Sequence, residues 1–121
     1  MQIDIQTHGI SLTDALRVYT ARRLRFALAG ASERVRRIKV RFSDVNGPRG
    51  GFDKRCRIQA TFNGLGEVMI EDTETDAFRA IGRAAARFGR SVSRRLQLRH
   101  SRDRSIPRRL RRLDASFIEQ V

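Results

Sequence analysis

Several residue types that stabilise or functionalise small proteins are scarce in this chain of 121 residues. It has one cysteine, two prolines, one tyrosine and no tryptophan. A single cysteine excludes an intramolecular disulfide framework and is typical of a reducing compartment. No segment approaches the roughly 18 apolar residues that a membrane-spanning helix needs, and the N-terminus lacks the basic-then-apolar pattern of a secretory signal. We therefore expect a cytoplasmic protein of one domain without a membrane partner.

Side chains that support catalysis are also scarce. His8 and His100 are the only histidines, and neither has a second ligand at metal spacing. Cys56 lies on the apolar side of an expected strand, which indicates a buried structural thiol. The glycine-containing segment 46–51 lacks the Gly-Lys-Ser/Thr ending of a nucleotide-binding loop. We expect no enzyme activity, cofactor, metal ion or small-molecule substrate.

Basic residues, in contrast, are abundant and clustered. The chain has 26 Lys and Arg residues against 13 Asp and Glu residues, a net charge of +13. Segment 79–112 contains 13 of the arginines and a single acid, Asp103. A GC-rich genome would also favour arginine over lysine, but it would not gather the charge in one segment. Guanidinium groups bind phosphates bidentately, so this clustering indicates a polyanionic partner, most simply a nucleic acid.

Hydrophobic periodicity in the N-terminal part predicts a short strand and a helix. Ile3 and Ile5 alternate with polar residues, as in a half-buried strand. The next segment has helical periodicity to about Leu28, and Ser11 is the expected N-cap. Arg23 falls near the middle of the apolar face of this helix. Either the end of the helix overhangs the core at this point, or the Arg23 side chain extends past the core to solvent.

Three strands and a long helix are predicted next. Alternating segments at 37–42 and 55–62 predict two strands, and a turn at 63–64 leads to a third at 67–71. An amphipathic helix is expected from about Thr73, as its N-cap, to Leu98. The acids Asp72, Glu74 and Asp76 are interpreted as charges at the start of this helix.

The order of elements, β-α-β-β-β-α, predicts an α+β fold. Both helices have one apolar face, so we expect a two-layer sandwich with the two helices on one side of a four-stranded sheet. The other side of the sheet would carry five basic residues, namely Arg37, Lys39, Arg41, Arg55 and Arg57. We expect residues 1–100 to form the domain and residues 101–121 a basic C-terminal tail.

The long helix is expected to expose a row of like charges opposite its apolar stripe: Arg79, Arg83, Arg87, Arg90 and Arg94. Like charges one turn apart destabilise an isolated helix, which favours a polyanion that neutralises them. The phenylalanines mostly fall on core faces, and tryptophan is absent. These observations favour recognition of the backbone and shape of structured RNA over base stacking.

Motifs in both helices then point to a known family. The first helix fits the pattern Ser/Thr-x-Ala-Leu-Arg-x-aromatic followed by a basic residue, in Thr13, Ala15, Leu16, Arg17, Tyr19 and Arg23. The second fits Asp-x-aromatic-x-Ala-Ile followed by alternating basic and apolar residues, in Asp76, Phe78, Ala80, Ile81, Arg87, Phe88, Arg90, Val92 and Arg94. With this order of elements, the chain resembles the short members of the family of ribosome hibernation-promoting factors and ribosome-associated inhibitor A, also called sigma-factor modulation proteins.

The resemblance implies a monomer that binds rRNA of the small ribosomal subunit in the cleft for mRNA and tRNA and preserves idle ribosomes in stationary phase or stress. The expected rRNA-binding residues are Arg22, Arg23, Arg25, Arg83, Arg87, Arg90, Arg94 and Arg95. Two other interpretations stay open at this point. One is a general structured-RNA-binding or RNA-chaperone module, and the other is a regulator of transcription that acts through protein contacts. The roles of the 46–51 loop and of the tail, and any effect on ribosome dimerisation, also stay open.

Overall fold

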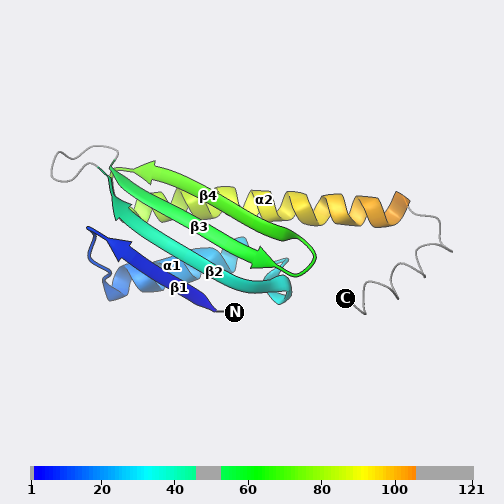
Figure 1. Ribbon diagram of the computed structural model, residues 1–121, viewed down its shortest axis with the longest axis horizontal. Coiled ribbons are helices and arrows are strands. Elements are labelled where there is room, and N and C mark those ends of the chain that lie inside the picture. Colours follow the sequence, from blue (N-terminus) through cyan, green and yellow to red (C-terminus); the bar gives the residue numbers. More distant parts are fainter. Residues whose placement is uncertain (1, 46–52, 106–121) are drawn as a thin grey trace.

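The computed structural model describes residues 2–45 and 53–105. In chain order the elements are β1 (Ile3–His8), α1 (Asp14–Ala27), the short 3-10 helix η1 (Ser32–Arg34), β2 (Val35–Asp44), β3 (Lys54–Phe62), β4 (Gly66–Glu74) and α2 (Ala77–Ser105). The four strands form one sheet in the order β1-β2-β3-β4. β1 is parallel to β2, and the other neighbouring pairs are antiparallel. Both helices lie on the same side of this sheet (Figure 1), which confirms the predicted two-layer α+β fold.

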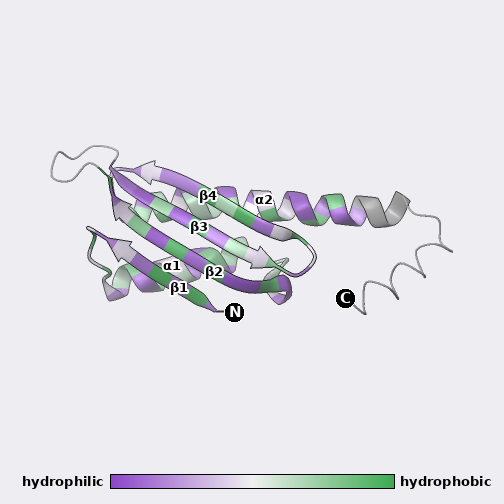
Figure 2. Ribbon diagram, viewed as in Figure 1, coloured by the Kyte–Doolittle hydropathy of each residue, from purple (hydrophilic) through white to green (hydrophobic). Residues whose placement is uncertain are grey.

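The core lies between the sheet and the helices, as the strand periodicity predicts. Hydrophobic and hydrophilic residues alternate along the strands (Figure 2), so one face of the sheet is apolar. That face contributes Ile38, Val40, Phe42, Cys56, Ile58, Ala60, Phe62 and Val68, all buried. The helices add a second buried set, which includes Leu16, Leu24, Leu28, Ile81, Ala84, Phe88 and Val92.

Burial determines the chemistry of the one cysteine. Cys56 is fully buried, which confirms the prediction of a structural thiol. Burial, together with the nearby charge of Asp72, raises the pKa of this thiol to about 12. The thiolate is therefore absent at neutral pH, and so is its nucleophilic reactivity.

The start of α2 differs from the expectation. The helix begins at Ala77, and its N-cap is Asp76, whose Oδ1 accepts a hydrogen bond from the Arg79 amide at 2.8 Å. Thr73 is instead part of β4, opposite Arg55 of β3. Pairing with β3 extends β4 through Glu74, so Asp72 and Glu74 are strand residues and not helix-start charges.

The other helix ends also move. Thr13, and not Ser11, caps α1, since its hydroxyl accepts a hydrogen bond from the Leu16 amide at 3.1 Å. α2 continues to Ser105, beyond the expected end at Leu98, and extends past the end of the sheet (Figure 1). Apolar periodicity reports packing against the sheet and fades where the helix leaves it, so it underestimates the helix.

Small residues allow the two helices to approach each other closely. A Cβ atom on Gly89 would lie 3.2 Å from Ala27 Cβ and 3.3 Å from the Ala27 carbonyl oxygen. One on Gly82 would lie 3.4 Å from the Tyr19 hydroxyl. The two glycines lower the stability of α2 as an isolated helix. They also allow α1 to pack directly against the backbone of α2.

The predicted turn after β3 is present, with Gly64 and Gly66 at φ angles of +81° and +78°. The 46–51 loop and residues 106–121 of the predicted tail lie outside the described residues. Within the described part of the chain, no helix is long and apolar enough to span a membrane.

Candidate nucleic-acid interface

An open groove of about 510 Å³ lies between α1 and α2, and all its lining residues belong to these two helices. Its floor and walls are formed by small or apolar residues, Phe26, Ala27, Ala85, Ala86 and Gly89. Its rim carries polar and basic residues, Arg23, Arg90, Ser93, Arg94 and Gln97. None of these lining residues is acidic, so the α1–α2 groove is a positively charged concavity.

Four of the predicted site residues are exposed and have no intramolecular partner among the described residues: Arg22 and Arg25 on α1, and Arg90 and Arg94 on α2. Arg90 and Arg94 line the groove, and Arg22 and Arg25 lie on the helix that forms its other wall. Unpaired guanidinium groups have all their donors available, so these four are the strongest candidates for phosphate contacts.

Arg83 and Arg87 are exposed as predicted, but they are paired within the molecule. Arg83 Nη1 lies 2.6 Å from Glu74 Oε1, and its Nε lies 3.8 Å from Asp72 Oδ2. Arg87 Nη1 lies 3.4 Å from the same Asp72 oxygen and donates to the Glu71 carbonyl at 2.9 Å. The hydrogen bond with Glu74 raises the pKa of Arg83. The acids of β4 therefore neutralise this flank of α2.

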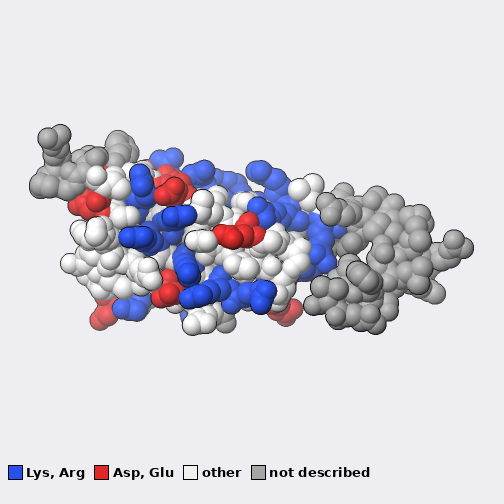
Figure 3. Space-filling model, viewed as in Figure 1, with Lys and Arg blue, Asp and Glu red and all other residues white. Residues whose placement is uncertain are grey.

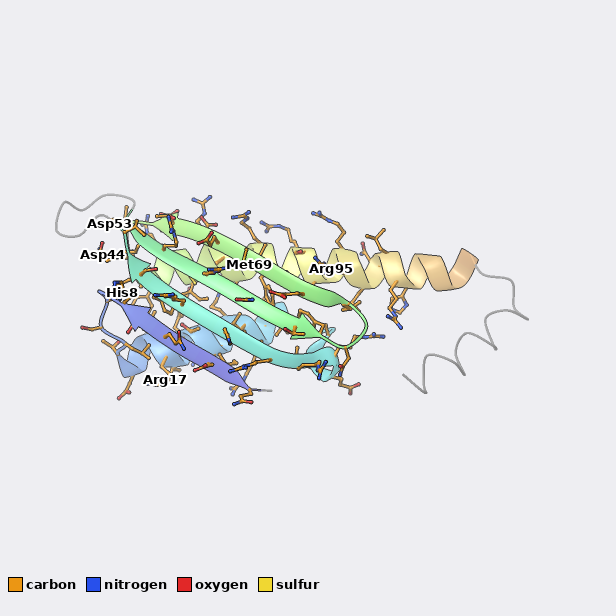
Figure 4. All side chains as sticks on the ribbon, viewed as in Figure 1. His8, Arg17, Asp44, Asp53, Met69 and Arg95 are labelled. Atoms are coloured by element: carbon orange, nitrogen blue, oxygen red, sulfur yellow. The ribbon has the colours of Figure 1, made fainter. Side chains whose placement is uncertain are left out.

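Arg95 serves the fold in a similar way. Its Nη1 donates to the Leu65 carbonyl at 2.8 Å, in the turn between β3 and β4 (Figure 4). Arg99, one turn later, donates to the Gly64 carbonyl at 2.7 Å. Arg79, at the other end of α2, pairs with Asp76 at 3.6 Å. These side chains attach α2 to the turn and to its own N-cap.

Arg23 connects the two helices. It is half-buried, and its Nη2 donates to the Gly82 carbonyl of α2 at 3.0 Å. Its Nε is buried and has no hydrogen-bond partner among the described residues. The sequence allowed either a helix end that overhangs the core or a side chain that extends past it. The structure supports the second, since the Arg23 side chain reaches the rim of the groove.

A family model described as Sigma 54 modulation protein / S30EA ribosomal protein matches residues 3–100. The chain belongs to this family. A search of curated protein sequences finds no match. The family assignment confirms the resemblance inferred from the helix motifs.

Two solved structures share the fold of this S30EA family member. The N-terminal domain of Protein Y from Thermus thermophilus superposes with a TM-score of 0.64 and 27% identity, over 78% of this chain and 98% of that chain. A ribosomal subunit interface protein from Coxiella burnetii superposes with a TM-score of 0.65 and 14% identity, over 78% of this chain and 96% of that chain. The second likeness concerns the fold alone.

Phe26 is the groove residue that sequence reasoning missed. The phenylalanines were expected mostly in the core, and Phe42, Phe62 and Phe88 are buried there. Phe26, however, exposes 79% of its surface, and Phe78 exposes 42% while packing against the Tyr19 ring at 5.5 Å. The exposure of Phe26 could have been found from the sequence, because Phe26 is two residues after buried Leu24 and therefore lies on the opposite side of the helix.

The open face of the sheet is a weaker candidate, because acidic residues lie among its basic ones (Figure 3). Arg55 lies 3.8 Å from Glu71, and Nε and Nη2 of Arg57 donate to the sulfur of Met69 at 3.2 and 2.9 Å (Figure 4). At the end of this sheet, Lys54 lies between Asp53 and Asp44, at 3.1 and 3.2 Å. Contact with Asp53 raises the pKa of Lys54. In the part of the chain that is described, no group of acidic, histidine and cysteine side chains could hold a metal ion.

Proposed function

We propose that this S30EA family protein binds rRNA of the small ribosomal subunit in the cleft for mRNA and tRNA, and that it thereby inhibits translation and preserves idle ribosomes. The observation that carries the proposal is the set of four unpaired arginines on α1 and α2, two of which line the α1–α2 groove, in a chain of a ribosome-associated family. The site of action would be the cytoplasm, and the active form would be the monomer.

The mechanism follows from charge and occlusion. Arg22, Arg25, Arg90 and Arg94 would contact rRNA phosphates and release condensed counterions. The domain would then fill a groove that tRNA and mRNA also require, so that bound protein and active translation exclude each other. Arg83, Arg87 and Arg95 would support the shape of this surface, since their donors already have partners on β4 and the turn after β3.

Salt-dependent binding to purified small subunits tests the proposal with two charge-matched variants. The first replaces Arg22, Arg25, Arg90 and Arg94 with Gln, and the second replaces Arg36, Arg37, Lys39 and Arg41 of β2 with Gln. All eight side chains are exposed, and each variant lowers the net charge from +13 to +9. Six to eight phosphate contacts should give the wild type a log–log salt slope of roughly −4 to −7.

The groove variant should flatten this slope by about 3 units and the β2 variant by less than about 1 unit. Equal effects of the two variants would contradict the assigned surface. A wild-type slope near zero would favour a regulator that acts through protein contacts, which agrees with the sigma 54 part of the family description. Displacement from ribosomes by excess competitor RNA in a stationary-phase lysate would favour a general RNA-binding module.

A further inference from the structure

The α1–α2 groove combines two kinds of surface that a phosphate site alone does not need. Guanidinium groups line it, but so do small and apolar residues, among them the exposed aromatic residue Phe26. A single exposed hydrophobic side chain is common on protein surfaces. This one borders a concavity whose volume, about 510 Å³, lies within the range of small-ligand sites.

The chemistry of the groove limits what it can hold. An apolar peptide would leave the arginines without partners, and a second copy of this chain would bring another net charge of +13 against them. An unpaired nucleotide offers a flat aromatic face and a negative charge directly beside it. Bases of this kind are stacked on aromatic side chains in single-stranded RNA recognition.

We propose that the α1–α2 groove binds one unstacked nucleobase of a single-stranded RNA segment, with Phe26 stacked on the base and Arg90 and Arg94 on the flanking phosphates. Arg90 and Arg94 are one helical turn apart, so their Cβ atoms are separated by about 5–6 Å. Both side chains line the groove and are long and flexible, so they can reach phosphates on either side of a bound base. The proposal rests on the proposed function and adds a contact with a base to its phosphate contacts.

Binding of a short single-stranded RNA and of the same sugar-phosphate backbone without bases separates the two kinds of contact. In fluorescence anisotropy, Phe26→Ala should weaken binding of the base-bearing strand by about 5- to 100-fold. Its effect on the abasic strand should be less than about twofold, because the phosphate contacts are unchanged. Val18→Ala is the matched control, since Val18 lies two turns earlier on α1, is 55% exposed and does not line the groove.

Two further substitutions separate stacking from apolar contact. Phe26→Leu keeps an apolar side chain without a ring and should bind the base-bearing strand as weakly as Phe26→Ala. Phe26→Trp keeps a ring and should restore binding. Because the chain has no tryptophan of its own, the fluorescence of this variant reports only on the groove and should be quenched by the base-bearing strand.

If Phe26→Ala loses equal affinity for the base-bearing and the abasic strand, or loses none for either, the proposed base site is wrong. If wild-type protein still co-sediments with small subunits in those cases, the proposed function survives. Absence of both ribosome and RNA binding by the wild type would overturn the two proposals together. A concentration-dependent dimer that Phe26→Ala abolishes, without any change in RNA binding, would assign the groove to self-association and refute the base site.

Discussion

Arg87 and Arg94 lie two turns apart on α2 and carry the same charge, but they differ in their partners. Arg87 is held by Asp72 at 3.4 Å and by the Glu71 carbonyl at 2.9 Å, whereas Arg94 has no partner among the described residues and lines the groove. Replacing each in turn with Ala removes one positive charge in both cases. The two variants therefore test whether the pairing of an arginine, and not its charge alone, determines its contribution to RNA binding.

The structure gives different magnitudes for the two changes. Loss of Arg94 should remove one phosphate contact, flatten the salt slope by about 0.7–0.9 and weaken binding about tenfold. Loss of Arg87 should change the slope by less than about 0.3, because Asp72 already neutralises this side chain. It should instead lower the free energy of unfolding by about 0.5–1 kcal/mol, since an exposed ion pair and a hydrogen bond are lost.

Both quantities can be measured on the same proteins. Co-sedimentation with purified small subunits between about 50 and 200 mM KCl gives the slopes, and thermal unfolding gives the stabilities. Arg87→Ala should lower the melting temperature by about 3–5 °C, and Arg94→Ala should leave it within about 1 °C. Equal slope changes for the two variants would show that the pairs with β4 break on binding, and would refute the distinction between paired and unpaired arginines.

Two further predictions concern stability. Burial raises the pKa of Cys56 to about 12 from an ordinary 9.0, so only the unfolded thiol ionises between these values. The free energy of unfolding should then fall by roughly 2 kcal/mol between about pH 9 and 10.5 in urea titrations, and Cys56→Ala should lack this fall. In thermal melts, Gly82→Ala should stabilise α2 by up to about 1 kcal/mol. Gly89→Ala should destabilise the protein, because its Cβ would lie 3.2 Å from Ala27 Cβ; the opposite order of the two glycine variants would contradict this helix packing.

The fold could be predicted because the residues that bury the core also set the periodicity of each element. Alternation in β2 and β3 has a period of two, and the stripe in α2 from Ile81 to Val92 has a helical period. The start of α2 could not be assigned in the same way. Thr73 and Asp76 both fit an N-cap, and only the pairing of Thr73 with Arg55 across β3 and β4 decides between them.

The candidate site was predictable in part for a related reason. Helical spacing correctly predicted that Arg83, Arg87, Arg90 and Arg94 would be exposed. It could not predict which of them would be paired, because that depends on how β4 packs beside α2. The pairs Arg83–Glu74 and Arg87–Asp72 join residues 9 and 15 positions apart in different elements. Contacts of this kind depend on tertiary structure and leave no local pattern.

The acids of β4 make the distribution of positive charge around α2 asymmetric. Asp72 and Glu74 lie on the inward face of the sheet edge, where they neutralise one flank of α2, and α2 itself has no acid between Ala77 and His100. Acidic side chains also lie among the basic ones on the open face of the sheet. The flank beside α1 keeps unneutralised arginines, and it carries the α1–α2 groove. A domain with uniform positive charge would bind a large RNA in many orientations, whereas one charged groove favours a single orientation. The proposed binding in one cleft of the small subunit requires such a preference, so the pairs on the β4 side would contribute to specificity by limiting contacts elsewhere.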